Sequence, residues 1–134
     1  MKISSQSREK GVVLVVDDDP LQADQIASFL QKHDIPVVVE TNGFAAVQAM
    51  KRLRPAVVVM DVKMPGLDGI EAARLASRLD PKPKIILISG YPDAVFRANR
   101  AHVEVFAVVD KPVPLRFLVK FIRKALSLAP LKSA

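Results

Sequence analysis

The chain contains no cysteine among its 134 residues. This absence excludes a disulfide framework and a zinc site built from thiolates. Long apolar runs are also missing, because the longest uninterrupted ones reach only the length of a strand, so no segment is expected to cross a membrane. The first ten residues are polar and lack the apolar centre of a secretory signal. We therefore expect a cytoplasmic protein without a membrane partner.

Positive charge exceeds negative charge, giving a formal net charge of +6. The acids Asp17, Asp18, Asp19 and Asp24 cluster early in the chain. Six cations gather late: Arg97, Arg100, Arg116, Lys120, Arg123 and Lys124. Such a basic stripe can bind nucleic acid or an acidic protein, although it can equally be a solvated helix face. Its only interleaved aromatic residues are Phe117 and Phe121, which core packing would also explain, so nucleic-acid binding is a minor option.

Apolar strand patterns and helical patterns alternate five times along the chain, as in a doubly wound α/β sheet. The predicted strands lie at about 12–16, 36–40, 56–60, 84–89 and 105–109. The predicted helices begin at Pro20, after an Asp19 cap, cover about 44–53, 69–79 and 92–100, and follow Pro114. A length of 134 residues suits one domain. We assign it to residues 11–127, with a flexible leader (1–10), a tail (128–134) and no output domain.

Three of the predicted helices have a distinct apolar face. We expect the buried positions to be Ala23, Ile26, Ala27 and Leu30 in the first helix, Val47, Met50 and Leu53 in the second, and Leu115, Leu118, Ile122 and Ala125 in the last. A stripe with this spacing is far more often core than a cofactor site.

The strand ends carry the functional signal. The run Val57-Val58-Val59-Met60 stops at Asp61, and the carboxyl ends of parallel strands are where ligands bind. Alone, each polar residue has an ordinary explanation: Asp19 is a helix cap, Ser89 a turn former and Lys111 a loop charge. Because Asp17, Asp61, Ser89 and Lys111 all follow predicted strands, we expect them at one sheet edge, acting on a metal and a phosphate.

Four stretches in this order and spacing resemble the receiver domains of bacterial two-component response regulators. They are Val15-Val16-Asp17-Asp18-Asp19-Pro20, Met60-Asp61-Val62-Lys63-Met64-Pro65-Gly66-Leu67-Asp68-Gly69, Ile88-Ser89-Gly90-Tyr91-Pro92 and Asp110-Lys111-Pro112. The resemblance covers about residues 11–127. It implies a five-stranded parallel sheet in the flavodoxin-like order 2-1-3-4-5, flanked by five helices.

The resemblance also implies a role for each matching residue. Asp61 would be the phosphoacceptor, with Ser89 and Lys111 binding the phosphoryl group. Asp17, Asp18, Asp61 and the backbone carbonyl of Lys63 would hold Mg²⁺, with Mn²⁺ as an alternative. The Lys111–Pro112 peptide bond is expected to be cis. Chemistry agrees with these roles, because Mg²⁺ prefers carboxylate and water oxygens, and converging carboxylates repel each other without a cation.

Some positions depart from the family pattern. Receivers usually carry Tyr or Phe three residues before the lysine, where this chain has Val108, and Phe106 lies two residues earlier. The aromatic part of the switch is therefore not expected here. His33 and His102 are expected to be surface or loop residues rather than ligands. Lys63 and Tyr91, which flank the site, are large enough to shield a phosphoryl group from water.

We expect a phosphorelay switch that takes its phosphoryl group from a histidine kinase or a phosphotransfer protein, and that is not an enzyme toward other substrates. Its predicted output surface consists of the helix at 92–100, the strand at 105–109 and the helix after Pro114, whose cations favour an acidic partner. Two alternatives are open: a phosphatase of the haloacid-dehalogenase kind, with Asp17 as nucleophile, and an interaction module that no longer uses phosphate.

Overall fold

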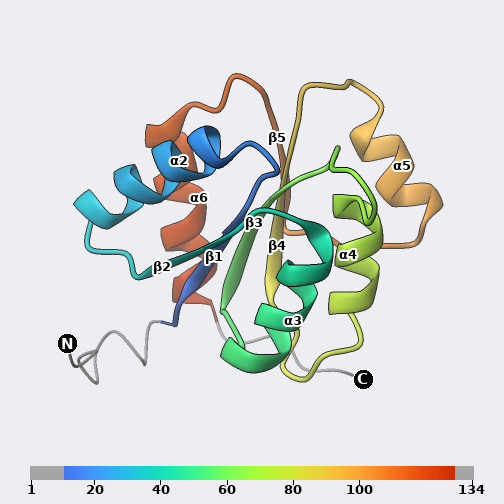
Figure 1. Cartoon of the computed structure of the whole chain (residues 1–134), viewed down its shortest axis with the longest axis horizontal. Coiled ribbons are helices and arrows are strands. Elements are labelled where there is room, and N and C mark those ends of the chain that lie inside the picture. Colours follow the sequence, from blue (N-terminus) through green and yellow to red (C-terminus); the bar gives the residue numbers. More distant parts are fainter. Residues whose placement is uncertain (1–10, 129–134) are drawn as a thin grey trace.

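The computed structural model describes residues 11–128, so the predicted leader and all of the predicted tail except Leu128 lie outside the described residues. Strands and helices alternate throughout (Figure 1). The strands are β1 (Val13–Val16), β2 (Val37–Glu40), β3 (Val57–Asp61), β4 (Lys84–Ser89) and β5 (Ala107–Asp110). The helices are α2 (Pro20–Lys32), α3 (Gly43–Leu53), α4 (Gly69–Ala76), α5 (Ala94–Arg100) and α6 (Leu115–Ser127).

The five strands form one parallel sheet in the order β2-β1-β3-β4-β5, which confirms the predicted fold. Every residue of β1, β3 and β4 is buried. These three strands are inner strands covered on both faces, which explains why they are continuous apolar runs rather than alternating patterns. The edge strand β2 is more exposed. All five strands end at the same edge of the sheet, where the predicted site residues are.

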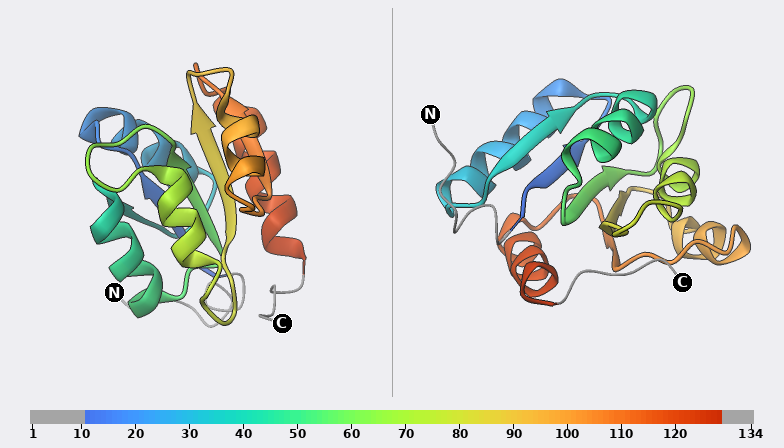
Figure 2. Two further views of the ribbon diagram at one scale, coloured as in Figure 1. Left: turned by 90° about the vertical axis from the view of Figure 1, so that its right-hand side faces the viewer. Right: turned by 90° about the horizontal axis from the view of Figure 1, so that it is seen from below.

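Helices cover both faces of the sheet (Figure 2). Residues of α3 and α4 pack with Leu14, Val16, Val58 and Met60 in one core cluster, which Ala94 of α5 also joins. Residues of α2 and α6 pack with the alternate strand residues, including Val13, Val15, Val57 and Val59, in a second cluster. This division follows from the strand geometry, since successive side chains point to opposite faces of the sheet.

Side-chain caps begin α2, α3 and α4, and two predicted helix ends differ from the observed ones. Asp19 caps α2 by accepting a hydrogen bond from the Leu21 amide, as predicted. α4 ends at Ala76 rather than Leu79, and α5 begins at Ala94 rather than Pro92. The chain turns through local hydrogen bonds after α4 and before α5, and boundaries of this kind are not set by apolar periodicity.

Most of the predicted core positions are buried, but the side chains of Leu53, Phe117 and Phe121 are exposed. Leu53, predicted to face inward, is 36% exposed. It sits in the last turn of α3, next to the chain reversal at Arg54. Phe117 and Phe121 project outward from α6 and are 59% and 40% exposed. Core packing therefore does not account for these two phenylalanines.

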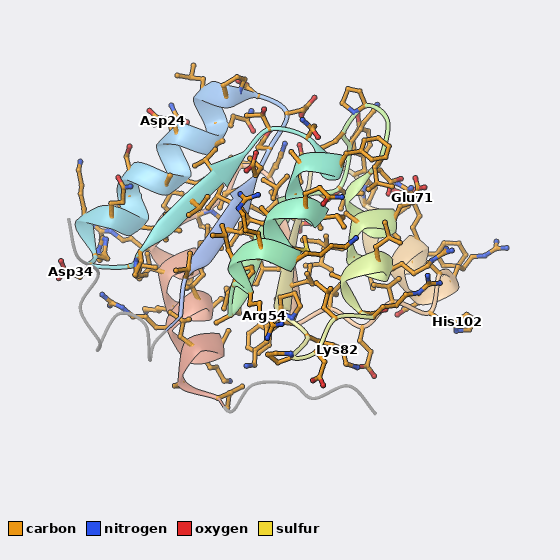
Figure 3. All side chains as sticks on the ribbon, turned by 60° about the horizontal axis from the view of Figure 1, so that its bottom comes forward. Asp24, Asp34, Arg54, Glu71, Lys82 and His102 are labelled. Atoms are coloured by element: carbon orange, nitrogen blue, oxygen red, sulfur yellow. The ribbon has the colours of Figure 1, made fainter. Side chains whose placement is uncertain are left out.

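The end of the sheet opposite the site is basic. Cations precede β3 and β4 or start β4, namely Lys51, Arg52, Arg54, Arg78, Lys82 and Lys84. Arg54 and Lys82 lie at the same margin of the molecule in Figure 3. Lys84 is buried, and burial lowers its pKa. Among residues 11–128, no helix combines the length and apolar character needed to cross a bilayer.

Candidate functional site

The strand register brings the predicted carboxylates together. Val16 of β1 pairs with Met60 of β3, so Asp17, just after β1, lies beside Asp61, the last residue of β3. Carboxylate oxygens of Asp17, Asp18 and Asp61 all lie within 4.8 Å of one another. Asp17 and Asp61 are buried, whereas Asp18 is exposed. The structure therefore places the three carboxylates in one cluster that opens to solvent on the Asp18 side.

The cluster is electrostatically unfavourable on its own. Burial raises the pKa of Asp17, and repulsion from Asp61 and Asp18 adds to the increase. A hydrogen bond from the Asp19 amide and the charge of Lys111 act in the opposite direction but do not cancel it. Two unit charges about 5 Å apart at an effective dielectric of 20 repel by about 3 kcal/mol. A cation in the cluster would remove this cost.

Lys111 supplies one positive charge. Its Nζ lies 3.1 Å from Oδ2 of Asp61, and its backbone amide donates to the Ser89 carbonyl, which fixes the β5 end against β4. Burial alone would lower the pKa of Lys111, but the hydrogen bond and attraction to Asp61, with Asp17 and Asp18 behind it, raise that pKa overall. Lys111 is thus held protonated. The Lys111–Pro112 bond is cis, as predicted.

Ser89 is the last residue of β4 and is buried, one strand away from Asp61. Its hydroxyl accepts a hydrogen bond from the Tyr91 amide (2.9 Å) and lies 3.1 Å from the Tyr91 carbonyl, to which it can donate. The side chain is therefore held by its own loop.

Lys63 and Tyr91 meet across the outside of the site. The Lys63 ammonium donates to the Tyr91 hydroxyl at 2.9 Å and lies 4.7 Å from the centre of its ring. The hydrogen bond to Tyr91 raises the pKa of Lys63. This contact joins the loop after β3 to the loop after β4, which are the loops that follow Asp61 and Ser89. Lys63 and Tyr91, which are large enough to shield the site, thus form one bridge between the two loops.

Two structural supports of the site were missed from the sequence. A Cβ at Gly69 would overlap the carbonyl oxygen of Asp61, so a residue without a side chain is needed where α4 starts against β3. Asp68 caps α4 through the Glu71 amide and also forms an ion pair of 2.8 Å with Arg97 of α5. Gly69 and Asp68 belong to the motif that begins at Met60. Their structural roles follow only from how closely α4 approaches β3 and α5.

The departures from the family pattern have clear structural positions. Val108 is half-buried and packs against the cluster beneath α3 and α4, whereas Phe106 packs against the cluster on the other face of the sheet. Phe106 therefore cannot replace the missing aromatic residue. His33 terminates α2 and packs on Phe29, and His102 is an exposed loop residue with φ of 55°. Neither histidine belongs to the acidic cluster.

The donor set suits a hard divalent cation. Carboxylate oxygens are ligands that Mg²⁺ accepts, and Mg²⁺ usually keeps several waters and takes few protein ligands. Asp17, Asp18 and Asp61 offer such oxygens, and their mutual repulsion favours a cation between them. The observed cluster therefore passes the chemical test for a magnesium or manganese site.

The comparisons with known proteins agree with this geometry. The model of the response regulator receiver domain matches residues 13–123, and the chain belongs to this family. Its fold is that of CheY-like receivers. The chain superposes on a putative response regulator from Chloroflexus aurantiacus with a TM-score of 0.80 at 22% identity, covering 88% of this chain and 98% of that one. The receiver domain of the putative response regulator NarL from Mycobacterium tuberculosis gives 0.79 at 26%, covering 89% and 98%.

Curated relatives are longer proteins. An uncharacterized response regulatory protein of Yersinia pestis is 34% identical over 112 residues, which cover 81% of this chain and 45% of that protein. The positive alginate biosynthesis regulatory protein of Pseudomonas aeruginosa is 34% identical over 117 residues, covering 84% and 46%. The chain thus spans less than half the length of these relatives.

Proposed function

We propose that this chain is a phosphoacceptor switch of a two-component phosphorelay, with Asp61 as the residue that is phosphorylated. The observation that carries the proposal is the position of Asp61. It lies at the end of β3, within a cluster of carboxylates, and a lysine held protonated is 3.1 Å from its side chain. An acid in this setting faces a positive charge that can stabilise a phosphoryl group.

The proposed reaction is an in-line phosphoryl transfer. A carboxylate oxygen of Asp61 attacks the phosphorus of a phosphohistidine in a histidine kinase or phosphotransfer protein. The new O–P bond makes an acyl phosphate, while the N–P bond breaks and its electron pair returns to the imidazole, which takes a proton from water. Lys111 neutralises charge on the transferred group. The chain thereby promotes only its own phosphorylation and dephosphorylation, so we do not class it as an enzyme toward other substrates.

Asp17, Asp18 and Asp61, with the carbonyl of Lys63, would hold the divalent cation. When bound, Mg²⁺ or Mn²⁺ neutralises negative charge on the phosphoryl oxygens. The protein's own contribution is to hold these carboxylates close together, so that a cation bound between them removes their mutual repulsion.

The proposed output is a change in the surface formed by α5, β5 and α6. Ser89 would leave the Tyr91 backbone and donate to a phosphoryl oxygen, drawing the loop before α5 toward Asp61. Moving a two-state surface from 1:99 to 99:1 needs about 5.5 kcal/mol of differential stabilisation. Two contacts, from Ser89 and Lys111, would supply part of it. Arg97, Arg100 and the cations of α6 favour an acidic protein as the partner of this surface.

The proposal is tested by intact mass spectrometry after incubation with acetyl phosphate and Mg²⁺. We expect one added phosphoryl group, which is absent in Asp61→Asn and after chelation of the metal. Asp34→Asn is the matched control, because Asp34 lies in the loop after α2, away from the site, and should leave the adduct intact. If Mg²⁺ binds but no adduct forms, the chain is a phosphate-independent interaction module and the proposal is wrong.

The phosphatase alternative requires Asp17 as nucleophile and leaves Asp61 without a role. Membership of the receiver family removes its basis. The same samples check this directly. Steady phosphate release that survives Asp61→Asn but is lost in Asp17→Asn would restore the alternative.

We further propose that the Lys63–Tyr91 bridge slows hydrolysis of the acyl phosphate by keeping water from it. Replacing both residues with Ala should speed the loss of phosphoryl from Asp61 several-fold, because the 2.9 Å contact over the site disappears. Decay is followed by intact mass after acetyl phosphate is removed. Phe44→Ala, a change at an exposed aromatic residue on α3, is the control. An unchanged decay rate in the double variant would show that the bridge does not act as a shield.

A further inference from the structure

The outer side of α6 carries an apolar stripe. Phe117 and Phe121 are 59% and 40% exposed, and Leu128, which follows the helix, is 48% exposed. Residues four positions apart lie on the same side of an α-helix, so Phe117 and Phe121 are neighbours about 6 Å apart along α6, and Leu128 follows at the end of the helix. We call them the α6 stripe. Large aromatic residues exposed in a line are characteristic of interaction surfaces rather than of ordinary surface.

Positive charge flanks the α6 stripe. α6 contains no acidic residue but carries Arg116, Lys120, Arg123 and Lys124, all exposed. The Lys120 ammonium lies 5.6 Å from the centre of the Phe117 ring. A ligand of this surface must therefore present carboxylates immediately beside apolar groups. An acidic amphipathic helix has this pattern, with apolar residues at every third or fourth position and acids along their sides.

The core holds α6 in place independently of the acidic cluster. Leu118, Ile122 and Ala125 are fully buried in the cluster shared with α2, β1 and β3. A guanidinium nitrogen of Arg123 donates to the His33 carbonyl at the end of α2 (3.3 Å), which adds a second anchor on the same side. The position of the α6 stripe is thus set by packing on the body of the domain, not by Asp61 or Ser89.

From these observations we infer that the α6 stripe is a standing docking site for an acidic amphipathic helix of a partner protein, bound whether or not Asp61 is phosphorylated. The inference rests on the proposed role of the α5–β5–α6 surface in binding a partner. It adds that the surface has two parts. The α6 stripe holds the partner, and the α5 part, which the phosphorylated site would move, changes how the held partner is engaged.

Two other occupants fit the surface less well. A second copy of the chain would bring the cations of two α6 helices together, and like charges face to face oppose association. An anionic bilayer places its phosphates above its acyl chains. At the α6 stripe the Lys120 ammonium instead lies beside the Phe117 ring. The partner must therefore offer acidic and apolar groups side by side rather than in separate layers.

The test is a selection of helical peptides from a random display library on the immobilised 134-residue chain. We expect enrichment of acidic amphipathic sequences that bind the unphosphorylated chain, and that bind it equally tightly after incubation with acetyl phosphate and Mg²⁺. Replacing Phe117 and Phe121 with Ser should weaken binding of the enriched peptides at least about tenfold, as for anchor residues of interfaces. Phe44→Ser, a change at a phenylalanine that is 65% exposed on α3, is the matched control and should bind normally. Circular dichroism verifies that each variant is folded.

Several outcomes would overturn the inference. They are no enrichment, enrichment of basic or neutral sequences, and binding that the Phe117 and Phe121 changes leave intact. Sedimentation with phosphatidylserine vesicles in place of peptide binding would identify a membrane contact instead, and dimerisation that the same changes abolish would identify a second copy. Because the selection and the measurements on the variants use unphosphorylated protein, failure there leaves the phosphoacceptor proposal standing. Failure to phosphorylate Asp61 likewise leaves this result unaffected.

Discussion

Asp17 is the residue whose surroundings conflict most with its charge. It is 3% exposed and shares a small volume with Asp61 and Asp18. The raised pKa of Asp17 means that the folded protein binds this proton more tightly than the unfolded chain does. Protonation of Asp17 therefore stabilises the metal-free fold, and that stabilisation is lost as the pH rises through the folded pKa, above the ordinary value of 3.8.

Asp17→Asn should make the metal-free protein more stable at neutral pH, by about 1 kcal/mol, because it removes repulsion at a buried site. The new side chain can still accept the hydrogen bond from the Asp19 amide. Urea unfolding in the presence of a chelator measures the change, and the advantage over the unaltered chain should shrink as the pH falls toward 4. Asp24→Asn, on the exposed side of α2, controls for net charge. A less stable Asn variant at neutral pH would show that the charge of Asp17 is compensated.

Gly69 is the tightest steric constraint beside the site. Gly69→Ala should destabilise the fold by about 2 kcal/mol or more, since the new Cβ would overlap the Asp61 carbonyl. Helix propensity alone predicts the opposite sign, a gain of about 1 kcal/mol for Ala over Gly inside a helix. Thermal or urea unfolding decides between them. Gly90→Ala is the control, because its Cβ would lie 3.9 Å from Lys111, an ordinary contact, and should cost much less.

The role of a residue could be predicted from the sequence where the residue belongs to a motif with a known chemical pattern. It could not be predicted where the role depends only on the three-dimensional contacts of the residue. Asp17, Asp61 and Lys111 follow strands, and strand ends converge, so their proximity could be deduced. The hydrogen bond from the Tyr91 amide to the Ser89 hydroxyl and the close approach of Gly69 to the Asp61 carbonyl depend on the conformation of the loops after β3 and β4. Those contacts leave no periodic signal in the sequence.

At the scale of elements, two bridges tie the segment around α5 to the loop after β3. Lys63 meets Tyr91, and Asp68 meets Arg97 at 2.8 Å. Since Asp68 also caps α4, the second bridge connects the start of α4 to the middle of α5. A movement of α5 relative to α4 would have to break this ion pair, so the pair should oppose the proposed switching.

A double-mutant cycle with Asp68→Asn and Arg97→Gln should give a coupling energy of about 0.5 to 1 kcal/mol. The value is modest because the two side chains are 21% and 43% exposed. Asn keeps the cap on the Glu71 amide, so the cycle isolates the ion pair from the capping effect. Urea unfolding supplies the four stabilities. A cycle with Arg100→Gln in place of Arg97→Gln should be additive, and additivity in both cycles would mean that the ion pair contributes nothing.

Element types were predictable because the inner strands are apolar runs and α2 and α6 have clear helical stripes. Element ends were less predictable. α4 stops three residues before the predicted end, and Leu53 turns outward beside Arg54, whose φ of 49° reverses the chain. Phe117 and Phe121 lie on α6, which has more apolar residues than its buried face accommodates. The sequence does not show which of these residues remain exposed.

At the scale of the whole molecule, metal binding should increase the free energy of unfolding. A ligand that binds only the folded state stabilises it by about 1.4 kcal/mol at ten times its Kd. Mg²⁺ should therefore raise the melting temperature of the unaltered chain, and should do so less for Asp61→Asn or Asp17→Asn. Sodium chloride at the same ionic strength is the control for general screening. An equal rise in the variants would place the ion elsewhere than in the acidic cluster.

The parallel strands also give the molecule two electrically different ends. The acids Asp17, Asp18 and Asp61 lie where the strands finish, and Arg54, Arg78 and Lys82 lie where strands begin. On a negatively charged support the molecule should avoid lying with the acidic cluster down, whether its basic end or the exposed cations of α6 make the contact. Immobilisation by charge alone would thus yield a layer in which Asp61 stays accessible from the solution.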